Sequence, residues 1–146
     1  DGDDWLYGKK GDDILNGGDG TNHIFGGAGS DTIKAESGEN YIYTHTDSET
    51  GEDLDTESDT NTVTITNATK NFIYGGRGIE NITIDSGRSH IYTKENDDIV
   101  TISNGELNEI YLGAGGDTLT INGGNNILIK TAKPTQTKIP QKIQTP

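Results

Sequence analysis

The sequence contains no cysteine and no methionine, and it is poor in apolar residues generally. Only 28% of its 146 residues are hydrophobic, whereas 21 are glycine. Without cysteine, neither disulfides nor a thiolate metal site can hold the fold. No apolar run is long enough for a membrane helix or a signal peptide, so we expect no direct membrane insertion. The length fits one domain, but the composition is too apolar-poor for an ordinary globular core.

Basic residues are also scarce relative to acidic ones. The chain has 24 acidic and 11 basic residues, for a net charge of −13. All 24 acids lie in residues 1–129, together with only seven of the bases. This excess argues against nucleic acid as a partner and in favour of cations. Without cations the chain repels itself, so we expect binding and folding to be coupled.

What the sequence does contain is a nine-residue repeat, clearest as GGDGTNHIF at residues 17–25 and GGAGSDTIK at residues 26–34. Each copy has glycine at its first, second and fourth positions, Asp or Asn at the sixth and an aliphatic residue at the eighth. The glycines permit positive φ in a tight reversal, and only the middle residue of the short strand that follows faces inward. Such strands are stable only when successive copies stack into a coil.

The aliphatic eighth position recurs thirteen times, nine or ten residues apart, with one longer gap. These positions are Leu6, Leu15, Ile24, Ile33, Ile42, Val63, Ile73, Ile82, Ile91, Val100, Ile110, Leu119 and Leu128. The residues beside them alternate, because every second strand carries aromatic residues and several of the others carry threonine. The pattern predicts thirteen strands in two facing sheets, with residues eighteen or nineteen apart as neighbours.

The repeat at residues 26–34 matches the GGxGxDxUx nonapeptide of the RTX (repeats-in-toxin) family position for position. The chain resembles that family closely over residues 1–43 and loosely over residues 61–129. The resemblance implies an all-β, right-handed parallel β-roll of two sheets with Ca²⁺ bound between turns. It further implies a calcium-binding module of a larger secreted bacterial toxin-type protein, exported by type I secretion and folded by calcium outside the cell. Other domains of the parent protein would then be partners.

The sixth positions of the repeat divide between the two edges of the expected roll. Calcium takes six to eight oxygen ligands, which stacked turns can supply from carboxylates and backbone carbonyls, with weak extracellular-type affinity of about 10⁻⁴ to 10⁻³ M. In order of preference, the expected pairs are Asp13 with Asp31, Asp4 with Asn22, and Asp98 with Asp117. The other expected metal ligands are Gly8, Lys10, Asp12, Gly26, Gly27 and Gly29. A metal-free alternative is that stacked Asp and Asn side chains form hydrogen-bonded ladders.

Two segments depart from the period. Residues 44–60 contain seven acids and no Lys or Arg, which predicts a mobile, solvated insertion, with a calcium loop as the alternative. Residues 130–146 contain three prolines, four lysines and no acid, which predicts a basic extended linker.

The outward residues of the aromatic sheet suggest a second type of function. Their spacing predicts columns of stacked rings, and a contiguous aromatic face can dock on a partner. The alternative function is therefore an adhesive or carbohydrate-binding module that contacts a host surface or glycan. Catalysis is not expected, because the three histidines have no nucleophile placed to work with them in a triad, and the sequence has no metalloprotease or phosphate-loop motif.

Overall fold

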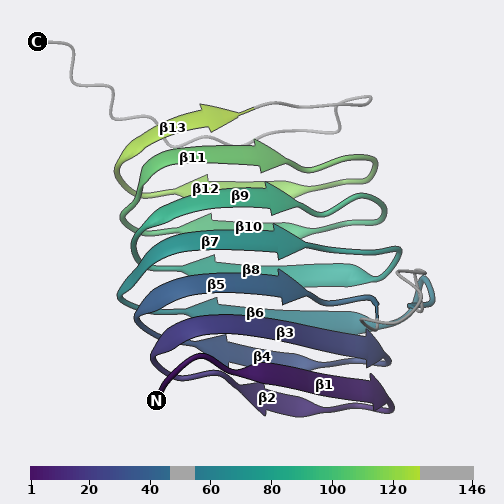
Figure 1. The fold of residues 1–146 in the computed structure, drawn as a ribbon. Coiled ribbons are helices and arrows are strands. Elements are labelled where there is room, and N and C mark those ends of the chain that lie inside the picture. The colour runs from purple at the N-terminus through teal and green to yellow at the C-terminus, as the bar shows by residue number, and fades with distance from the viewer. Residues whose placement is uncertain (47–54, 129–146) are drawn as a thin grey trace, which may run out of the picture.

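Thirteen strands stack in two parallel sheets in the computed structural model, which describes residues 1–46 and 55–128. The seven-stranded sheet contains, in spatial order, β1 (Trp5–Lys10), β3 (Gly20–Ala28), β5 (Gly38–Tyr43), β7 (Ala68–Tyr74), β9 (Arg88–Tyr92), β11 (Glu106–Tyr111) and β13 (Asn125–Leu128). The six-stranded sheet contains β2 (Ile14–Asn16), β4 (Thr32–Ala35), β6 (Thr60–Ile65), β8 (Ile79–Ile84), β10 (Ile99–Ile102) and β12 (Thr118–Ile121). The chain passes from one sheet to the other after each strand (Figure 1).

This architecture is a β-roll, as the sequence predicts. Each pairing is parallel and joins equivalent positions of the repeat, so that Leu6 lies beside Ile24 and Ile24 beside Ile42. The longer gap in the period is spanned in the same register, with Ile42 beside Ile73. Within the described residues, no helix is long and apolar enough to cross a membrane.

The core is a column of aliphatic side chains between the two sheets, and it is thicker than the repeat predicts. The eighth positions from Ile24 to Leu119 are all buried. In the six-stranded sheet, Ile65, Ile84 and Ile102 are also fully buried, two residues after each eighth position. These strands continue past the nonapeptide, and because side chains alternate along a strand, the second isoleucine faces inward as well.

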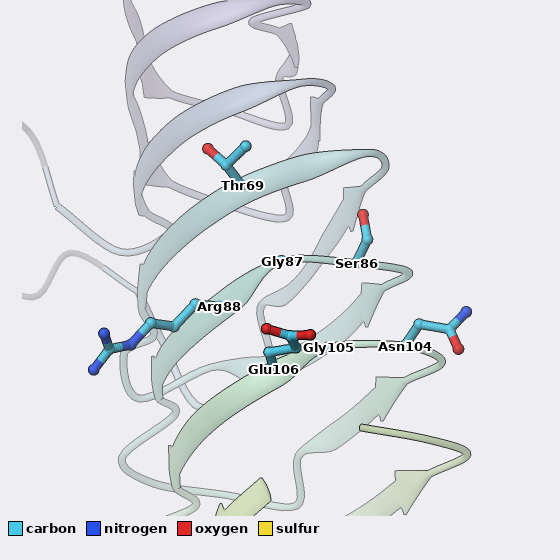
Figure 2. Close-up of a pocket in the computed structure, with 7 residues that line it drawn as sticks. All are labelled: Thr69, Ser86, Gly87, Arg88, Asn104, Gly105 and Glu106. Atoms are coloured by element: carbon cyan, nitrogen blue, oxygen red, sulfur yellow. The ribbon is translucent and has the colours of Figure 1, made fainter. Parts of the chain in front are cut away.

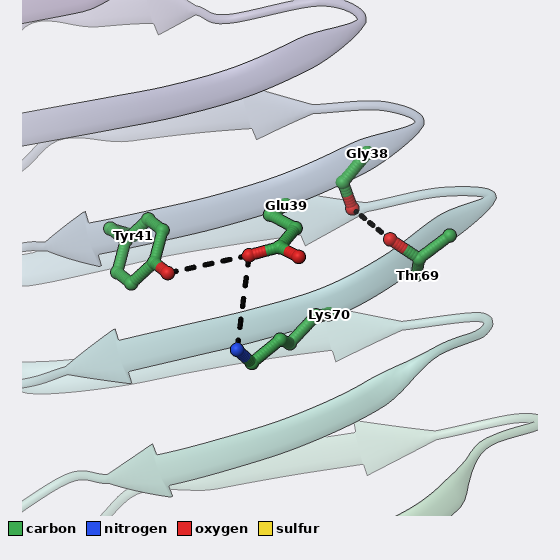
Figure 3. A network of polar contacts seen from close by, with 5 residues as sticks. All are labelled: Gly38, Glu39, Tyr41, Thr69 and Lys70. Atoms are coloured by element: carbon green, nitrogen blue, oxygen red, sulfur yellow. Dashed lines mark hydrogen bonds and ion pairs between the residues drawn. The ribbon is translucent and has the colours of Figure 1, made fainter.

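The extra residue in a ten-residue spacing is absorbed as a local irregularity in strand pairing. Between β5 and β7 the register shifts at Gly38 and Glu39, which leaves Thr69 as the additional residue. The Thr69 hydroxyl donates a hydrogen bond to the Gly38 carbonyl at 2.9 Å, and Lys70 Nζ lies 3.8 Å from Glu39 Oε2 (Figure 3). The Tyr41 hydroxyl donates to the same carboxylate oxygen at 3.3 Å. The Thr69 and Lys70 contacts join β5 to β7 at the additional residue, and the Tyr41 contact holds the Glu39 carboxylate within β5.

The outward face of the seven-stranded sheet carries two columns of aromatic rings, as predicted. One column contains Trp5, His23, Tyr41, Phe72 and His90, and the other contains Tyr7, Phe25, Tyr43, Tyr74, Tyr92 and Tyr111. Neighbouring centroids within a column lie 4.2 to 5.3 Å apart, with near-parallel planes. Because the rings cover one another's faces, they present mainly their edges to solvent. The adhesive or glycan-binding role of this surface stays a prediction.

Candidate metal centre

The turns that follow the odd-numbered strands form one edge of the roll, which we name the acidic edge after its sixth-position residues. These are Asp13, Asp31, Asn61, Glu80, Asp98 and Asp117, and all but the half-buried Asp13 are at most 2% exposed. Except between Asn61 and Glu80, successive turns are joined in one way: a sixth-position backbone N–H donates to the side-chain oxygen of the next sixth-position residue. Asp13 N–H donates to Asp31 Oδ1 at 2.9 Å, and Asp31 N–H to Asn61 Oδ1 at 2.9 Å. The turns therefore hold the carboxyl groups in a buried column.

The second carboxylate oxygen in this column is left without a partner. Asp13 Oδ2, Asp31 Oδ2, Glu80 Oε2 and Asp98 Oδ2 are buried and accept no hydrogen bond within the described part of the chain. A buried, ionised oxygen in this state costs free energy unless a donor or a cation satisfies it. The repeated unpartnered oxygen makes this edge the candidate position for a positively charged ligand.

The first glycine of each consensus turn keeps open the space that these oxygens face. A Cβ placed on Gly8 would lie 2.7 Å from Asp13 Oδ2 and closer still to the Gly26 carbonyl oxygen. A Cβ on Gly26 would lie 2.5 Å from the Thr44 carbonyl oxygen and closer still to Asp31 Oδ2. A carboxylate oxygen and a carbonyl oxygen therefore converge on a small space that any side chain would fill.

The remaining residues predicted for the first two turns lie around this space or outside it. Gly27 and Gly29 have positive φ and pack so closely on the backbone of the preceding turn that a Cβ would clash. Lys10 pairs with Ala28 at the end of β1. The exposed Asp12 turns outward, and its Oδ1 accepts a hydrogen bond from Ser30 N–H at 2.9 Å. Their assignment as metal ligands stays a prediction.

Burial raises the pKa of the carboxyl groups along the acidic edge. It raises the pKa of Asp31 from 3.8 to about 6, with the nearby Asp13 and Asp12 charges adding to the effect. Burial likewise raises the pKa values of Glu80 and Asp98. The charges of Glu80 and Asp117 add to the rise at Asp98, whereas hydrogen bonds from Gly76 N–H and the Asn61 amide oppose the rise at Glu80. Each of these carboxyl groups therefore keeps its proton to a higher pH than an exposed carboxyl does, unless a nearby cation stabilises the ionised form.

The opposite edge, which we name the amide edge, is built from the same repeat position, but most of its buried side chains hydrogen-bond to one another. Its sixth-position residues with described side chains are Asp4, Asn22, Asn40, Asn71, Ser89 and Asn108. Asn22 Nδ2 donates to Asn40 Oδ1 at 3.0 Å, and Asn40 Nδ2 donates to Asn71 Oδ1 at 3.2 Å. The ladder that the sequence offered as the metal-free alternative is therefore present on this edge. For the predicted pair of Asp4 and Asn22, one acceptor, Asn22 Oδ1, remains buried without a partner among the described residues.

The donor set of the acidic edge fits a hard divalent cation. The convergent atoms are carboxylate and carbonyl oxygens, the ligands that calcium prefers. The described residues contain no group of three or more His, Cys, Asp or Glu side chains that could hold a metal by themselves. A cation here would therefore depend on backbone carbonyls, as the close approach of Gly26 and Thr44 to the Asp13 and Asp31 carboxylates allows.

Sequence reasoning missed part of this edge. Glu80 occupies a sixth position but was not among the predicted ligands, because a glutamate departs from the repeat. Part of the inserted segment also differs from the solvated loop predicted there. Thr44, His45, Thr46 and Asp55 are buried, whereas Thr56, Glu57 and Ser58 are exposed. The Thr44 hydroxyl donates to Glu80 Oε1 at 3.1 Å, so the insertion begins inside the column. Residues 47–54 and the predicted linker at 130–146 lie outside the described residues.

A shallow depression also lies at the turns of the amide edge. It encloses about 350 Å³ and is lined by Thr69, Ser86, Gly87, Arg88, Asn104, Gly105 and Glu106 (Figure 2). Its two charged residues, Arg88 and Glu106, are exposed, and the Arg88 side chain extends away from the Glu106 carboxylate. The depression lacks the buried, convergent polar groups that distinguish the acidic edge.

A family model described as the RTX calcium-binding nonapeptide repeat, in four copies, matches residues 1–33 and 16–47. The match covers the glycine-rich turns that carry Asp13 and Asp31. Neither the curated proteins nor the solved structures contain a match to this chain.

Proposed function

We propose that this chain, which carries RTX calcium-binding nonapeptide repeats in residues 1–47, is a calcium-binding β-roll module that folds when the ion binds. One observation carries the proposal. In consecutive turns, the buried Oδ2 atoms of Asp13 and Asp31 accept no hydrogen bond within the described residues, and each faces a backbone carbonyl across a space kept open by glycine. Calcium, a hard cation, would supply the missing partner.

The residues of the first two turns would share this task. Asp13 and Asp31 would contribute carboxylate oxygens, and the Gly26 carbonyl would contribute a backbone oxygen. Gly8 and Gly26 would leave room for the ion because they have no side chain. Lys10, Asp12, Gly27 and Gly29 complete the proposed set. The later pair of Asp98 and Asp117 is proposed on the same grounds of position and burial. The pair of Asp4 and Asn22 ranks below both, because Asn22 already donates within the amide ladder.

Coupled folding follows from the charge of the chain. Its net charge is −13, and several of the acids are buried side by side along one edge. Binding that occurs only in the folded state stabilises that state by mass action. RTX repeats are typical of proteins that bacteria secrete, and we propose that this module belongs to a larger secreted protein of the toxin type. Low calcium in the cytosol would keep it unfolded for type I secretion, and extracellular calcium would fold it.

Circular dichroism with and without a chelator tests this function. We expect strand signal at millimolar calcium and its loss in chelator, with recovery when calcium is restored. The double substitution Asp13→Asn and Asp31→Asn should raise the calcium concentration required for folding. Exposed Glu36 and Glu106, changed together to Gln, give a matched control with the same loss of charge. Equal strand content in calcium and in chelator would refute the proposal.

A further inference from the structure

The third turn of the acidic edge breaks the pattern of its neighbours. Its sixth-position residue is Asn61, and one side of the amide behaves as an aspartate does: Asn61 Oδ1 accepts the hydrogen bond from Asp31 N–H at 2.9 Å. Its other side is a donor. Where Asp31 has an unpartnered oxygen, Asn61 therefore has the NH₂ group.

That NH₂ group lies between two buried carboxylates. Asn61 Nδ2 donates to Asp55 Oδ2 at 2.7 Å and lies 3.5 Å from Glu80 Oε1. Asp55, within the inserted segment, is fully buried. An N–H donor partly compensates the negative charge of a carboxylate, as a cation would. The same N–H group repels a cation. The amide thus occupies the role of an ion at this turn.

Beyond Asn61, the arrangement of the first two turns returns. Glu80 N–H donates to Asp98 Oδ1 at 2.9 Å, as Asp13 N–H does to Asp31 Oδ1. Glu80 Oε2 and Asp98 Oδ2 are buried and accept no hydrogen bond from the described residues. A Cβ on Gly75 would lie 2.7 Å from Glu80 Oε2 and 2.9 Å from the Thr93 carbonyl oxygen. A carboxylate and a carbonyl oxygen again converge on a space kept open by glycine.

We propose that Glu80 and Asp98 form a second site for a hard divalent cation, separated from the site of Asp13 and Asp31 by the hydrogen-bonded bridge of Asn61. The second site lies outside residues 1–47, to which the family model extends. It departs from the nonapeptide, because its carboxylate is a glutamate and Thr93 stands where the repeat has glycine. The inference rests on the proposed function in that both sites use the same oxygen chemistry.

Calcium binding to purified variants tests the second site, with the number of bound ions measured by equilibrium dialysis and by titration calorimetry. We expect the variant with Glu80→Gln and Asp98→Asn to bind at least one ion fewer than the wild type. Glu80→Gln alone, which leaves the proposed pair of Asp98 and Asp117 intact, should also bind one ion fewer, and an unchanged ion count in this single variant would overturn the site. We expect the variant with Asp13→Asn and Asp31→Asn to retain calcium binding that the further changes E80Q and D98N abolish.

The outcomes separate the two proposals. If the wild type binds no calcium, the proposed function itself fails. If the wild type binds calcium but E80Q with D98N binds as many ions, the second site is overturned and the unpartnered oxygens share a proton instead. The same conclusion follows if D13N with D31N removes all binding while circular dichroism in calcium shows the variant folded.

The bridge of Asn61 is tested separately by a gain of one bound ion, a result that a misfolded variant would not give. The substitution Asn61→Asp replaces the NH₂ group by an oxygen beside Asp55 and Glu80. We expect this variant to bind one ion more than the wild type. Asn16→Asp makes the same change of charge at an exposed position on β2 and should bind the wild-type number. An unchanged ion count in N61D would overturn the bridge.

Discussion

The two edges of the roll use the same position of the same repeat and differ in one functional group. On the acidic edge, Asp31 Oδ1 accepts a backbone hydrogen bond and Oδ2 is left without a partner among the described residues. On the amide edge, Asn40 Oδ1 accepts from Asn22 and Nδ2 donates to Asn71. An amide carries both a donor and an acceptor, so it can continue a ladder through many turns, whereas a carboxylate carries acceptors only.

This difference places the proposed calcium dependence of the module on one edge. The amide ladder satisfies itself by hydrogen bonds along most of its length, so in the folded module it needs no cation. The acidic edge concentrates charge that its own backbone cannot compensate. Asn61 supports this reading, because a single amide on the acidic edge bridges Asp55 and Glu80 as the ladder bridges its neighbours. Exchanging the groups between the edges is therefore the strongest way to test the comparison.

The largest effect is expected from Asn40→Asp, which places a carboxylate in the middle of the amide ladder. Asn40 is fully buried between Asn22 and Asn71, and the change removes its donor while adding a buried charge. A buried charge without a partner typically costs about 3 to 5 kcal/mol. Denaturation by urea in saturating calcium measures the loss. Asn16→Asp on exposed β2 is the control, and equal stability of the two variants would contradict the assignment.

The next effect, about 2 kcal/mol, is expected from pH in the absence of calcium. Burial raises the pKa of Asp31 from 3.8 to about 6 in the folded chain. A carboxyl with a raised folded-state pKa contributes its full stability below the unfolded pKa, and this is lost as pH rises through the folded pKa. Acidification from about pH 7 to about pH 4 in chelator should therefore increase the folded fraction, followed by circular dichroism.

In that experiment, Glu80 and Asp98 act in the same direction, because burial raises their pKa values too. The combined substitution of Asp31, Glu80 and Asp98 by their amides is expected to flatten the pH profile. An increase of the folded fraction with rising pH in chelator would show that the buried carboxyls do not control the calcium-free state.

Much of the fold could be predicted from the repeat, because its geometry is local. Glycines at fixed places set the turns, and one aliphatic residue per strand sets the face, so the register of Leu6, Ile24 and Ile42 follows from the period alone. The second buried aliphatic residues, such as Ile65 and Ile84, could not be derived from the nonapeptide, because they depend on how far each strand extends beyond it.

The neighbours in the candidate site were predictable from the period of the repeat, also outside the consensus: Asp98 N–H donates to Asp117 Oδ1 at 3.3 Å, as the predicted pairing of these residues requires. The adjacency of Asp13 and Asp31 follows from a spacing of eighteen residues. The burial of Asp55 does not, because Asp55 lies within an insertion whose acidic composition suggests exposure to solvent. Nor does the sequence distinguish Asn61 as a bridge from an asparagine that merely ends a turn, since the distinction depends on the carboxylates of Asp55 and Glu80 being brought to its amide.

A smaller effect is expected from Gly26→Ala, which fills the space between Asp31 and the Thr44 carbonyl. We expect about tenfold weaker binding of one calcium ion, or about 1.4 kcal/mol, measured by titration calorimetry. Gly17→Ala is the matched control, at the same repeat position on the amide edge, where the new Cβ would meet the Asn22 side chain. It should reduce stability without changing the number of bound ions. Equal effects on calcium binding would mean that the open space has no special role.

The smallest loss of stability is expected from removing a ring of the aromatic face, which lies on neither edge and which we expect to be independent of calcium. Tyr74 stacks between Tyr43 and Tyr92 at 5.0 and 5.3 Å. Cross-strand pairs of this kind contribute up to about 1 kcal/mol each, so Tyr74→Ala should lower the free energy of unfolding by about 1 kcal/mol in saturating calcium. Thr83→Ala, at an exposed position on β8, is the control.

The Tyr74 ring lies on the outer face of the sheet, away from the carboxylate column. The affinity for calcium should therefore be unchanged when it is measured under conditions in which the variant and the wild type are both fully folded. A loss of bound ions in the Tyr74 variant would show that the aromatic columns and the acidic edge form one cooperative unit. Calcium binding would then depend on the seven-stranded sheet as well as on the acidic edge.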